Sequence, residues 1–115
     1  MERVQTTATF PSISAAGLAE FKRVAAEALA VTKTEPGTLQ YDWFFSADES
    51  VCVVRETYAD SDAVLAHLGN VGPLLAPLID LGGGIKVEVF GSPSQQLLEA
   101  TAALQPMVFG FSQGL

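Results

Sequence analysis

The sequence predicts an α+β fold of the ferredoxin-like, split βαβ type, in which two strand–helix–strand halves share one antiparallel sheet. The order of the periodic segments gives this topology, because strand, helix and strand patterns occur twice in succession. Two alternating segments in the middle of the chain follow each other closely enough to form a hairpin. With 115 residues, 49% hydrophobic and 17% charged, we expect residues 1–115 to form a single domain.

The first half begins with an alternating segment at residues 2–10, which predicts a strand. Ser14 is expected to cap the long helix that follows, and Pro36-Gly37 to end it, because proline cannot donate within a helix and glycine tolerates the reversal of the backbone. The apolar stripe of this helix consists of Leu18, Phe21, Ala25, Ala28, Leu29 and Thr32.

The hairpin is predicted at residues 39–45 and 51–58, around a polar loop. A register that pairs Phe45 with Cys52 sets Asp42 opposite Arg55, and opposite charges in that position stabilise the pair by roughly 0.2–1 kcal/mol. One face of the hairpin would then present Leu39, Tyr41, Trp43, Phe45, Cys52, Val54, Glu56 and Tyr58.

The second half begins with a helix capped by Asp60 or Ser61. Its apolar face follows the helical spacing of Val64, His67, Leu68 and Val71. Gly72-Pro73 is expected to start a second helical piece, and the glycines at residues 82–84 to end it.

A fourth strand is predicted at residues 85–89 from the alternation of Ile85, Val87 and Val89. Ser92-Pro93 has the form of a helix start and predicts a short helix. Residues 106–111 would form a final strand or an arm that packs on a partner subunit, and their role stays open.

Glu56 and His67 are the candidate catalytic residues, because the predicted packing places both at the same interior space. A lone buried carboxylate is costly unless it is paired or protonated. His67 suits a general base, since an unperturbed histidine pKa near 6.5 needs little adjustment at neutral pH. Glu56 would orient the imidazole, or act as the base itself if burial raises its pKa. A core histidine with a structural glutamate partner explains the same pattern.

Four aromatic residues of the same interior, Phe10, Tyr41, Trp43 and Tyr58, are the candidate substrate-binding residues, because an aromatic substrate could stack on them. A sheet face covered by helices must be apolar whatever its function, so these rings could equally be core. Arg55 lies on the opposite face in this register and is not expected at the site.

Charge and composition exclude several function classes. The net charge is −7 with no cluster of basic residues, which makes nucleic acids and anionic membranes poor partners. One histidine and one cysteine give no metal-ligand set, and Cys52 is expected to be a small buried hydrophobic residue. No secretory leader is recognisable at the N-terminus and no apolar run approaches the length of a membrane span, so we expect a cytoplasmic protein.

The sheet face without helices needs a cover, since it would present Phe44, Val51 and Val53 beside Arg55. A second copy of the chain, related by a two-fold axis, would bury this surface. The sequence therefore predicts a homodimer through the sheet face.

Three motifs together resemble the antibiotic biosynthesis monooxygenase family, which includes quinol monooxygenases. They are EPGTLQYDWF at residues 35–44, RETYAD at residues 55–60 and DAVLAHL at residues 62–68, and the order of elements extends the resemblance over roughly residues 2–90. This chain departs from the family pattern in two respects: it has Tyr58 where a tryptophan is common, and its residues 69–84 are rich in proline and glycine. The haem-degrading branch is a poor match, since the first strand has no asparagine at residues 4–6.

The resemblance implies a dimeric α+β barrel with a pocket between sheet and helices in each subunit. For some members it also implies oxidation of a quinol or polycyclic phenol by O2 without metal or flavin, which would need His67 or Glu56 as the base and no cofactor. The alternative hypothesis is a non-catalytic protein on the same barrel that binds an apolar small molecule. The sequence leaves the substrate open.

Overall fold

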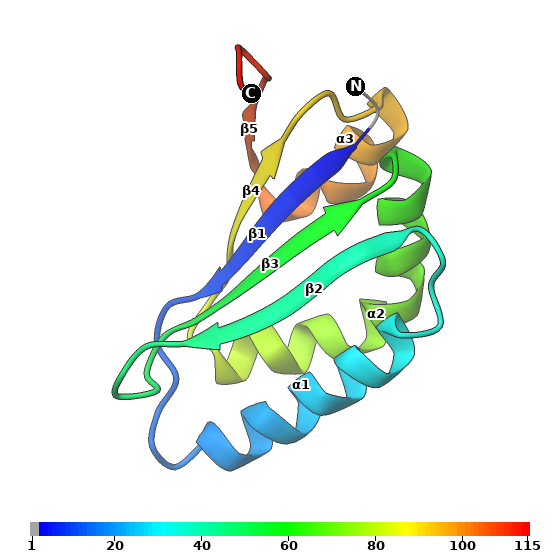
Figure 1. Ribbon diagram of the computed structural model, residues 1–115. Helices are drawn as coiled ribbons and strands as arrows, with labels where there is room; N and C mark the ends of the chain where they lie inside the picture. Colours follow the sequence, from blue (N-terminus) through cyan, green and yellow to red (C-terminus); the bar gives the residue numbers. More distant parts are fainter. Residues whose placement is uncertain (1–2) are drawn as a thin grey trace.

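The computed structural model describes residues 3–115 and consists of a sheet with strand order β2-β3-β1-β4-β5, covered on one face by helices (Figure 1). β1, β3, β2 and β4 pair in antiparallel fashion, whereas β5 is parallel to β4. This confirms the predicted ferredoxin-like fold and adds a fifth strand; residue 2 of the expected first strand lies outside the described residues. The elements are β1 (Val4–Phe10), α1 (Leu18–Thr32), β2 (Thr38–Phe45), β3 (Cys52–Tyr58), α2 (Ser61–Leu81), β4 (Lys86–Phe90), α3 (Gln95–Thr101), the 3₁₀ turn η1 (Ala102–Leu104) and β5 (Met107–Phe109).

The hairpin has the predicted register. Phe45 pairs with Cys52, Tyr41 with Glu56, and Asp42 faces Arg55. The expectation for Leu39 was wrong, because a bulge interrupts the pairing between Thr38 and Gln40 and leaves Leu39 51% exposed. A bulge sets two residues of one strand against one of its partner and so shifts the alternation of faces.

α1 begins at Leu18, later than expected, with Gly17 as its N-cap. Ser14 instead stabilises the preceding turn, where its hydroxyl accepts a hydrogen bond from the Gly17 amide at 3.0 Å. The buried stripe of α1 also differs from the prediction, since Leu29 is exposed, Leu18 is only partly buried, and Val24 is buried although it was not predicted. The buried residues are Phe21, Val24, Ala25, Ala28 and Thr32.

α2 is one continuous helix, so the predicted restart at Gly72-Pro73 was wrong in detail. Asp60 caps it as expected and accepts from the Ala63 amide at 2.8 Å. Pro73 and Pro77 lie inside the helix, and Figure 1 shows that α2 changes direction part way along. A proline inside a helix removes a backbone donor and bends the axis without necessarily ending the helix.

By length and composition alone, α2 is long and apolar enough to cross a membrane, with a mean hydropathy of 1.4. The sequence prediction had found no run of this kind. Length and composition are weak indications, since the core helix of a globular domain meets the same criteria. In this fold Val64, Val71 and Leu78 of α2 are buried.

The end of α2 and the start of α3 fix the remaining connections. Gly83 has a φ of +71°, and a Cβ there would lie 2.5 Å from the Ser12 carbonyl oxygen, so only glycine fits this turn. α3 is capped by Ser94, which accepts from the Leu97 amide at 3.1 Å, and not by Ser92 as expected. Pro93 therefore precedes the cap.

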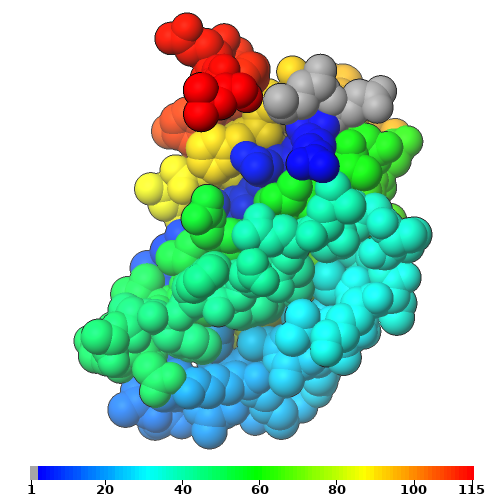
Figure 2. Space-filling model, viewed as in Figure 1, coloured from blue at the N-terminus to red at the C-terminus, as the bar shows by residue number. Residues whose placement is uncertain are grey.

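The C-terminal segment forms a strand for part of its length, as one of the two expectations stated. In β5, Phe109 stacks on Phe90 of β4 with ring centroids 5.2 Å apart. Figure 2 looks onto the sheet face without helices and shows the C-terminal residues (red) standing out at one end of it. All three residues of β5 are exposed.

Candidate active site

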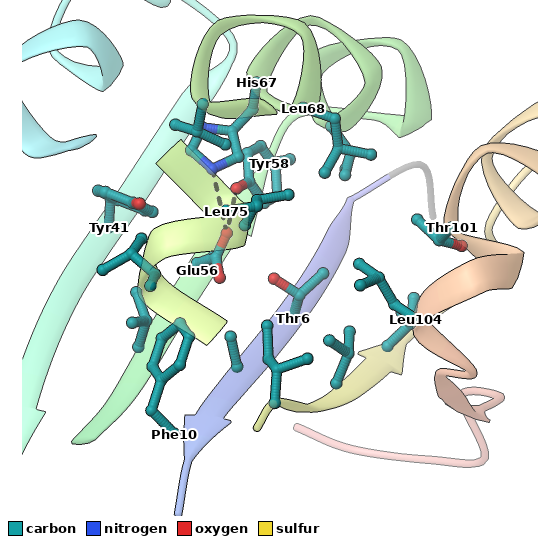
Figure 3. A pocket seen from close by; sticks show the side chains of 18 of the residues that line it. Thr6, Phe10, Tyr41, Glu56, Tyr58, His67, Leu68, Leu75, Thr101 and Leu104 are labelled. Carbon is teal, nitrogen blue, oxygen red and sulfur yellow. Dashed lines mark hydrogen bonds and ion pairs between the residues drawn. The ribbon is translucent and has the colours of Figure 1, made fainter. Parts of the chain in front are cut away.

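A cavity of about 70 Å³ lies between the helix-covered face of the sheet and helices α2 and α3 (Figure 3). All six residues singled out from the sequence line it, namely Phe10, Tyr41, Trp43, Glu56, Tyr58 and His67. Aliphatic side chains of α2, β4 and α3 make up most of the remaining wall. The cavity wall is therefore mostly apolar, with Glu56 and His67 as its ionisable groups and the hydroxyls of Thr6 and Thr101 as further polar atoms.

His67 and Glu56 lie side by side at the wall of the cavity, as Figure 3 shows. The distance between His67 Nε2 and Glu56 Oε1 is 3.6 Å. The hydroxyl of Tyr58 donates a hydrogen bond to the same Glu56 oxygen. The side chains of His67 and Glu56 are 5% and 11% exposed, so both groups are shielded from bulk water.

Sequence reasoning missed Glu35, which contacts the other side of the imidazole. His67 Nδ1 lies 3.0 Å from Glu35 Oε1, and the Glu35 side chain is only 5% exposed. Thr38 donates to Glu35 Oε1 at 2.7 Å, and Asn70 donates to Glu35 Oε2 at 2.9 Å. We had expected Glu56 to orient the imidazole, but Glu35 makes the shorter contact.

Burial gives the two cavity groups unusual proton affinities. It raises the pKa of Glu56 to about 7, against the hydrogen bonds from Tyr58 and Thr6, which lower it. Burial also lowers the pKa of His67, although the nearby Glu35 carboxylate opposes this shift. At neutral pH the imidazole is therefore uncharged and Glu56 is close to half protonated, so a proton acceptor and a proton donor share one apolar space.

The aromatic rings surround this pair. Tyr41 and Tyr58 have ring centroids 4.9 and 5.4 Å from that of His67, while Phe10 and Trp43 stack with an interplanar angle of 4°. Burial, as the largest cause, raises the pKa of both tyrosines, so each hydroxyl keeps its proton. Trp43 Nε1 is buried without a hydrogen-bond partner in the described part of the chain.

Other candidate groups stay apart from the cavity. Arg55 is exposed on the opposite face of β3 and makes no ion pair with Asp42 among the described residues, where Asp42 accepts from Gln40 at 3.0 Å instead. Cys52 is fully buried, and burial raises the pKa of its thiol to about 11, so it is not a nucleophile at neutral pH. Within residues 3–115 no group of three metal-binding side chains occurs.

Solved structures with this fold include proteins from several bacteria. MupZ from Pseudomonas fluorescens aligns with a TM-score of 0.81 and 24% identity, over 100% of this chain and 94% of that protein. A Caulobacter crescentus protein described as a candidate antibiotic biosynthesis monooxygenase aligns with a TM-score of 0.64 and 29% identity, over 76% and 87%. SnoaB, a cofactor-independent oxygenase from Streptomyces nogalater, aligns with a TM-score of 0.63 and 21% identity, over 83% and 97%.

A comparison with curated proteins found no match to this chain. The sequence profile of the antibiotic biosynthesis monooxygenase family matches residues 7–72, which is more than half of the chain and includes the end of β1, α1, the hairpin and the first part of α2. The resemblance seen in the three sequence motifs is thereby confirmed. The chain belongs to the antibiotic biosynthesis monooxygenase family.

Proposed function

We propose that the protein is a cofactor-independent monooxygenase that oxidises an electron-rich aromatic molecule, a quinol or a polycyclic phenol, with O2. The observation that carries the proposal is the buried, uncharged imidazole of His67 beside Glu56 in an apolar cavity. A neutral imidazole can take a phenolic proton, and an apolar space favours O2 and an aromatic ring over water. That SnoaB, a cofactor-independent oxygenase, has the same fold supports the proposal by analogy only.

His67 Nε2 acts as the base in this scheme. Removal of the phenolic proton leaves an anion electron-rich enough to give one electron to O2, and the two resulting radicals combine into a substrate peroxide. The peroxide forms at a ring carbon that bears a hydrogen. After protonation of its outer oxygen, the O–O bond breaks as this carbon loses its hydrogen as a proton, so that hydroxide leaves and one oxygen atom stays in a new carbonyl group. Protonated Glu56, which its pKa near 7 keeps partly neutral, gives the proton to the peroxide and takes up the proton of the carbon as the O–O bond breaks. The departing hydroxide takes the proton held by His67 and leaves as water, which restores both residues. In the alternative scheme Glu56 is the base, and variants of the two residues distinguish the schemes.

The size of the cavity adds a condition. Small-molecule sites usually enclose about 300–1,000 Å³, whereas this cavity measures about 70 Å³. A polycyclic substrate can enter only if wall residues move. Leu68, Leu75 and Leu104 line the cavity and are only partly buried. We therefore expect these side chains of α2 and η1 to move when a substrate binds.

We further propose that a second copy of the chain covers the sheet face without helices. Large apolar side chains are exposed there and on the C-terminal segment: Phe44, Met107, Val108, Phe109 and Phe111 are 42–59% exposed. An apolar patch of this kind is typical of an interface. Light scattering after size exclusion should give a dimer mass, and Phe44→Asp should convert it to monomer; a wild-type monomer at all concentrations contradicts this proposal.

Oxygen uptake tests the activity. Chelator-treated, flavin-free protein is assayed against quinols, naphthols and anthrones, with His67→Ala, Glu56→Gln and the exposed-carboxylate control Glu99→Gln. We expect saturable uptake that falls about 100-fold or more in His67→Ala, since general-base catalysis is worth about 10²–10⁴-fold. A larger fall in Glu56→Gln than in His67→Ala would make Glu56 the base.

The alternative hypothesis, a non-catalytic protein that binds an apolar ligand in the same cavity, gives a different result. Trp43 is the only tryptophan and lines the cavity, so its fluorescence reports binding directly. Saturable quenching by a naphthol, unchanged in His67→Ala and without O2 uptake above the uncatalysed rate, would favour the binding protein.

A further inference from the structure

We propose that Glu35 is the positioning residue of this site: it holds the His67 imidazole with its proton on Nδ1, so that the lone pair of Nε2 faces the cavity. The consequence for catalysis rests on the proposed function. The tautomer itself is a property of the resting protein and can be measured without any substrate.

Hydrogen-bond accounting around Nδ1 leads to this assignment. Nδ1 lies 3.0 Å from Glu35 Oε1 and 3.4 Å from Thr32 Oγ1. The Thr32 hydroxyl gives its single proton to the Ala28 carbonyl at 2.7 Å, so it offers only a lone pair to His67. Nδ1 thus faces two acceptors, and a buried nitrogen in that position must carry the proton.

Glu35 is itself fixed as an acceptor. Thr38 donates to one of its oxygens and Asn70 to the other, at 2.7 and 2.9 Å. These donors come from the start of β2 and from α2, three residues after His67. The carboxylate is therefore held by both elements that it joins, and its loop position just before Pro36 does not leave it free to turn.

The opposite side of the ring offers no comparable constraint. Glu56 Oε1 is 3.6 Å from Nε2, beyond a normal hydrogen bond, and the rings of Tyr41 and Tyr58 contact the imidazole through their faces and edges. Within residues 3–115, four titratable side chains face His67: Glu35, Glu56, Tyr41 and Tyr58. Among these four, Glu35 alone accepts a hydrogen bond from Nδ1. The imidazole is oriented from one side and left reactive on the other.

Glu35 also acts once His67 has taken a proton. The imidazolium then lies against a carboxylate at 3.0 Å, which stabilises the charged form that burial disfavours. Glu35 accordingly raises the pKa of His67, against the lowering effect of burial. A substitution of Glu35 should therefore reduce turnover more than it reduces substrate affinity.

Nitrogen NMR of the sole histidine tests the assignment. Tag-free protein labelled with ¹⁵N-histidine is compared as wild type, Glu35→Gln, Glu35→Ala and the exposed control Glu99→Gln. We expect the wild type and Glu99→Gln to carry the proton on Nδ1 at neutral pH. Glu35→Gln keeps this tautomer, because the amide oxygen still accepts, but its histidine titrates at lower pH; Glu35→Ala shifts the population toward Nε2–H.

Kinetics then separate positioning from a structural role. Glu35→Ala should lower kcat about 100-fold with little change in KM, and Glu35→Gln should recover part of the loss. A wild-type imidazole with its proton on Nε2, or a wild-type spectrum in Glu35→Ala, would overturn the proposal. If Glu35→Ala does not fold, the tautomer of the wild type and the titration of His67 in Glu35→Gln still test the proposal. If the wild type carries the proton on Nδ1 but shows no O2 uptake, the proposed oxygenase activity fails and the role of Glu35 in orienting His67 stands.

Discussion

The two faces of β3 place neighbouring residues in opposite surroundings. Glu56 is on the helix-covered face, where it contacts Tyr58 and His67 at the wall of an apolar cavity. Arg55, one residue earlier, is exposed on the open face. On that face Glu88 of β4 accepts from the Thr7 hydroxyl at 2.9 Å and is only partly buried.

The comparison shows that burial under the helix layer, and not the residue type or the strand, raises the pKa of a carboxyl group of this sheet. Burial is the largest cause of the raised pKa of Glu56. A group held near its neutral form at physiological pH can both give and take a proton. The open face has more charged and polar groups, among them Asp42, Arg55 and Glu88, but no helix layer buries them.

The largest effect that tests this difference is the pH dependence of stability. Folding raises the pKa of Glu56 from 4.5 to about 7, so the folded protein binds this proton more tightly than the unfolded chain. Its free energy of unfolding therefore falls as the pH rises from about 4.5 to about 7, by about 3 kcal/mol, and is constant above that range.

Glu56→Gln imitates the protonated side chain and should lack this fall. Denaturant unfolding at a series of pH values measures it as the difference between wild type and variant, which also cancels the opposite trend from His67, whose lowered pKa costs stability in acid. Glu88→Gln, on the open face, should follow the wild type. Parallel curves for wild type and Glu56→Gln would mean that the covered face does not protonate Glu56.

A smaller effect is expected when two neighbouring valines of β3 are replaced by alanine, measured as the loss in free energy of unfolding. Val54 is 2% exposed in the covered core, so Val54→Ala should cost about 2 kcal/mol, from lost transfer energy and the cavity left behind. Val53 is only half-buried on the open face and should cost less than about 1 kcal/mol as Val53→Ala in a monomer. Chemical denaturation at several protein concentrations distinguishes the cases, because a cost for Val53 that grows with concentration indicates a covered interface.

The sequence predicted the covered face well because its cause is local. Alternation along both strands and the facing charges of Asp42 and Arg55 gave the hairpin register, and the helical spacing around His67 gave the face of α2. Together these placed Glu56 and His67 at one interior space, which the distance of 3.6 Å bears out. Their roles in catalysis stay predictions.

Glu35 could not be found in this way, because its position depends on a chain reversal and not on a period. It lies in the loop before Pro36-Gly37, and only tertiary packing brings it to a helix 32 residues away in sequence. The wrong prediction for Leu39 has the same cause. A bulge adds one residue to a strand, and the alternation of apolar and polar residues does not show where it lies. For Pro73 the local signal gave the wrong prediction. Proline usually ends a helix, but α2 continues through Pro73.

The smallest effect concerns the Trp43 indole N–H on the covered face. It is buried and has no acceptor among residues 3–115. On the open face, by contrast, the Thr57 hydroxyl donates to Gln40 at 2.8 Å. A ligand oxygen that accepts from Trp43 would gain one hydrogen bond, worth about 0.5–1.5 kcal/mol, or about 2- to 12-fold in affinity.

Trp43→Phe keeps an aromatic ring but removes this donor together with one ring of the indole, so the loss of stacking affects naphthol and naphthalene alike and the loss of the hydrogen bond affects the naphthol alone. The variant should therefore weaken binding of a naphthol more than binding of naphthalene. Titration calorimetry with both ligands measures the difference in one protein. An equal loss for the two would mean that Trp43 acts through stacking and shape alone. A greater loss for the naphthol would mean that the covered face provides a hydrogen-bond donor for a ligand oxygen beside Glu56 and His67.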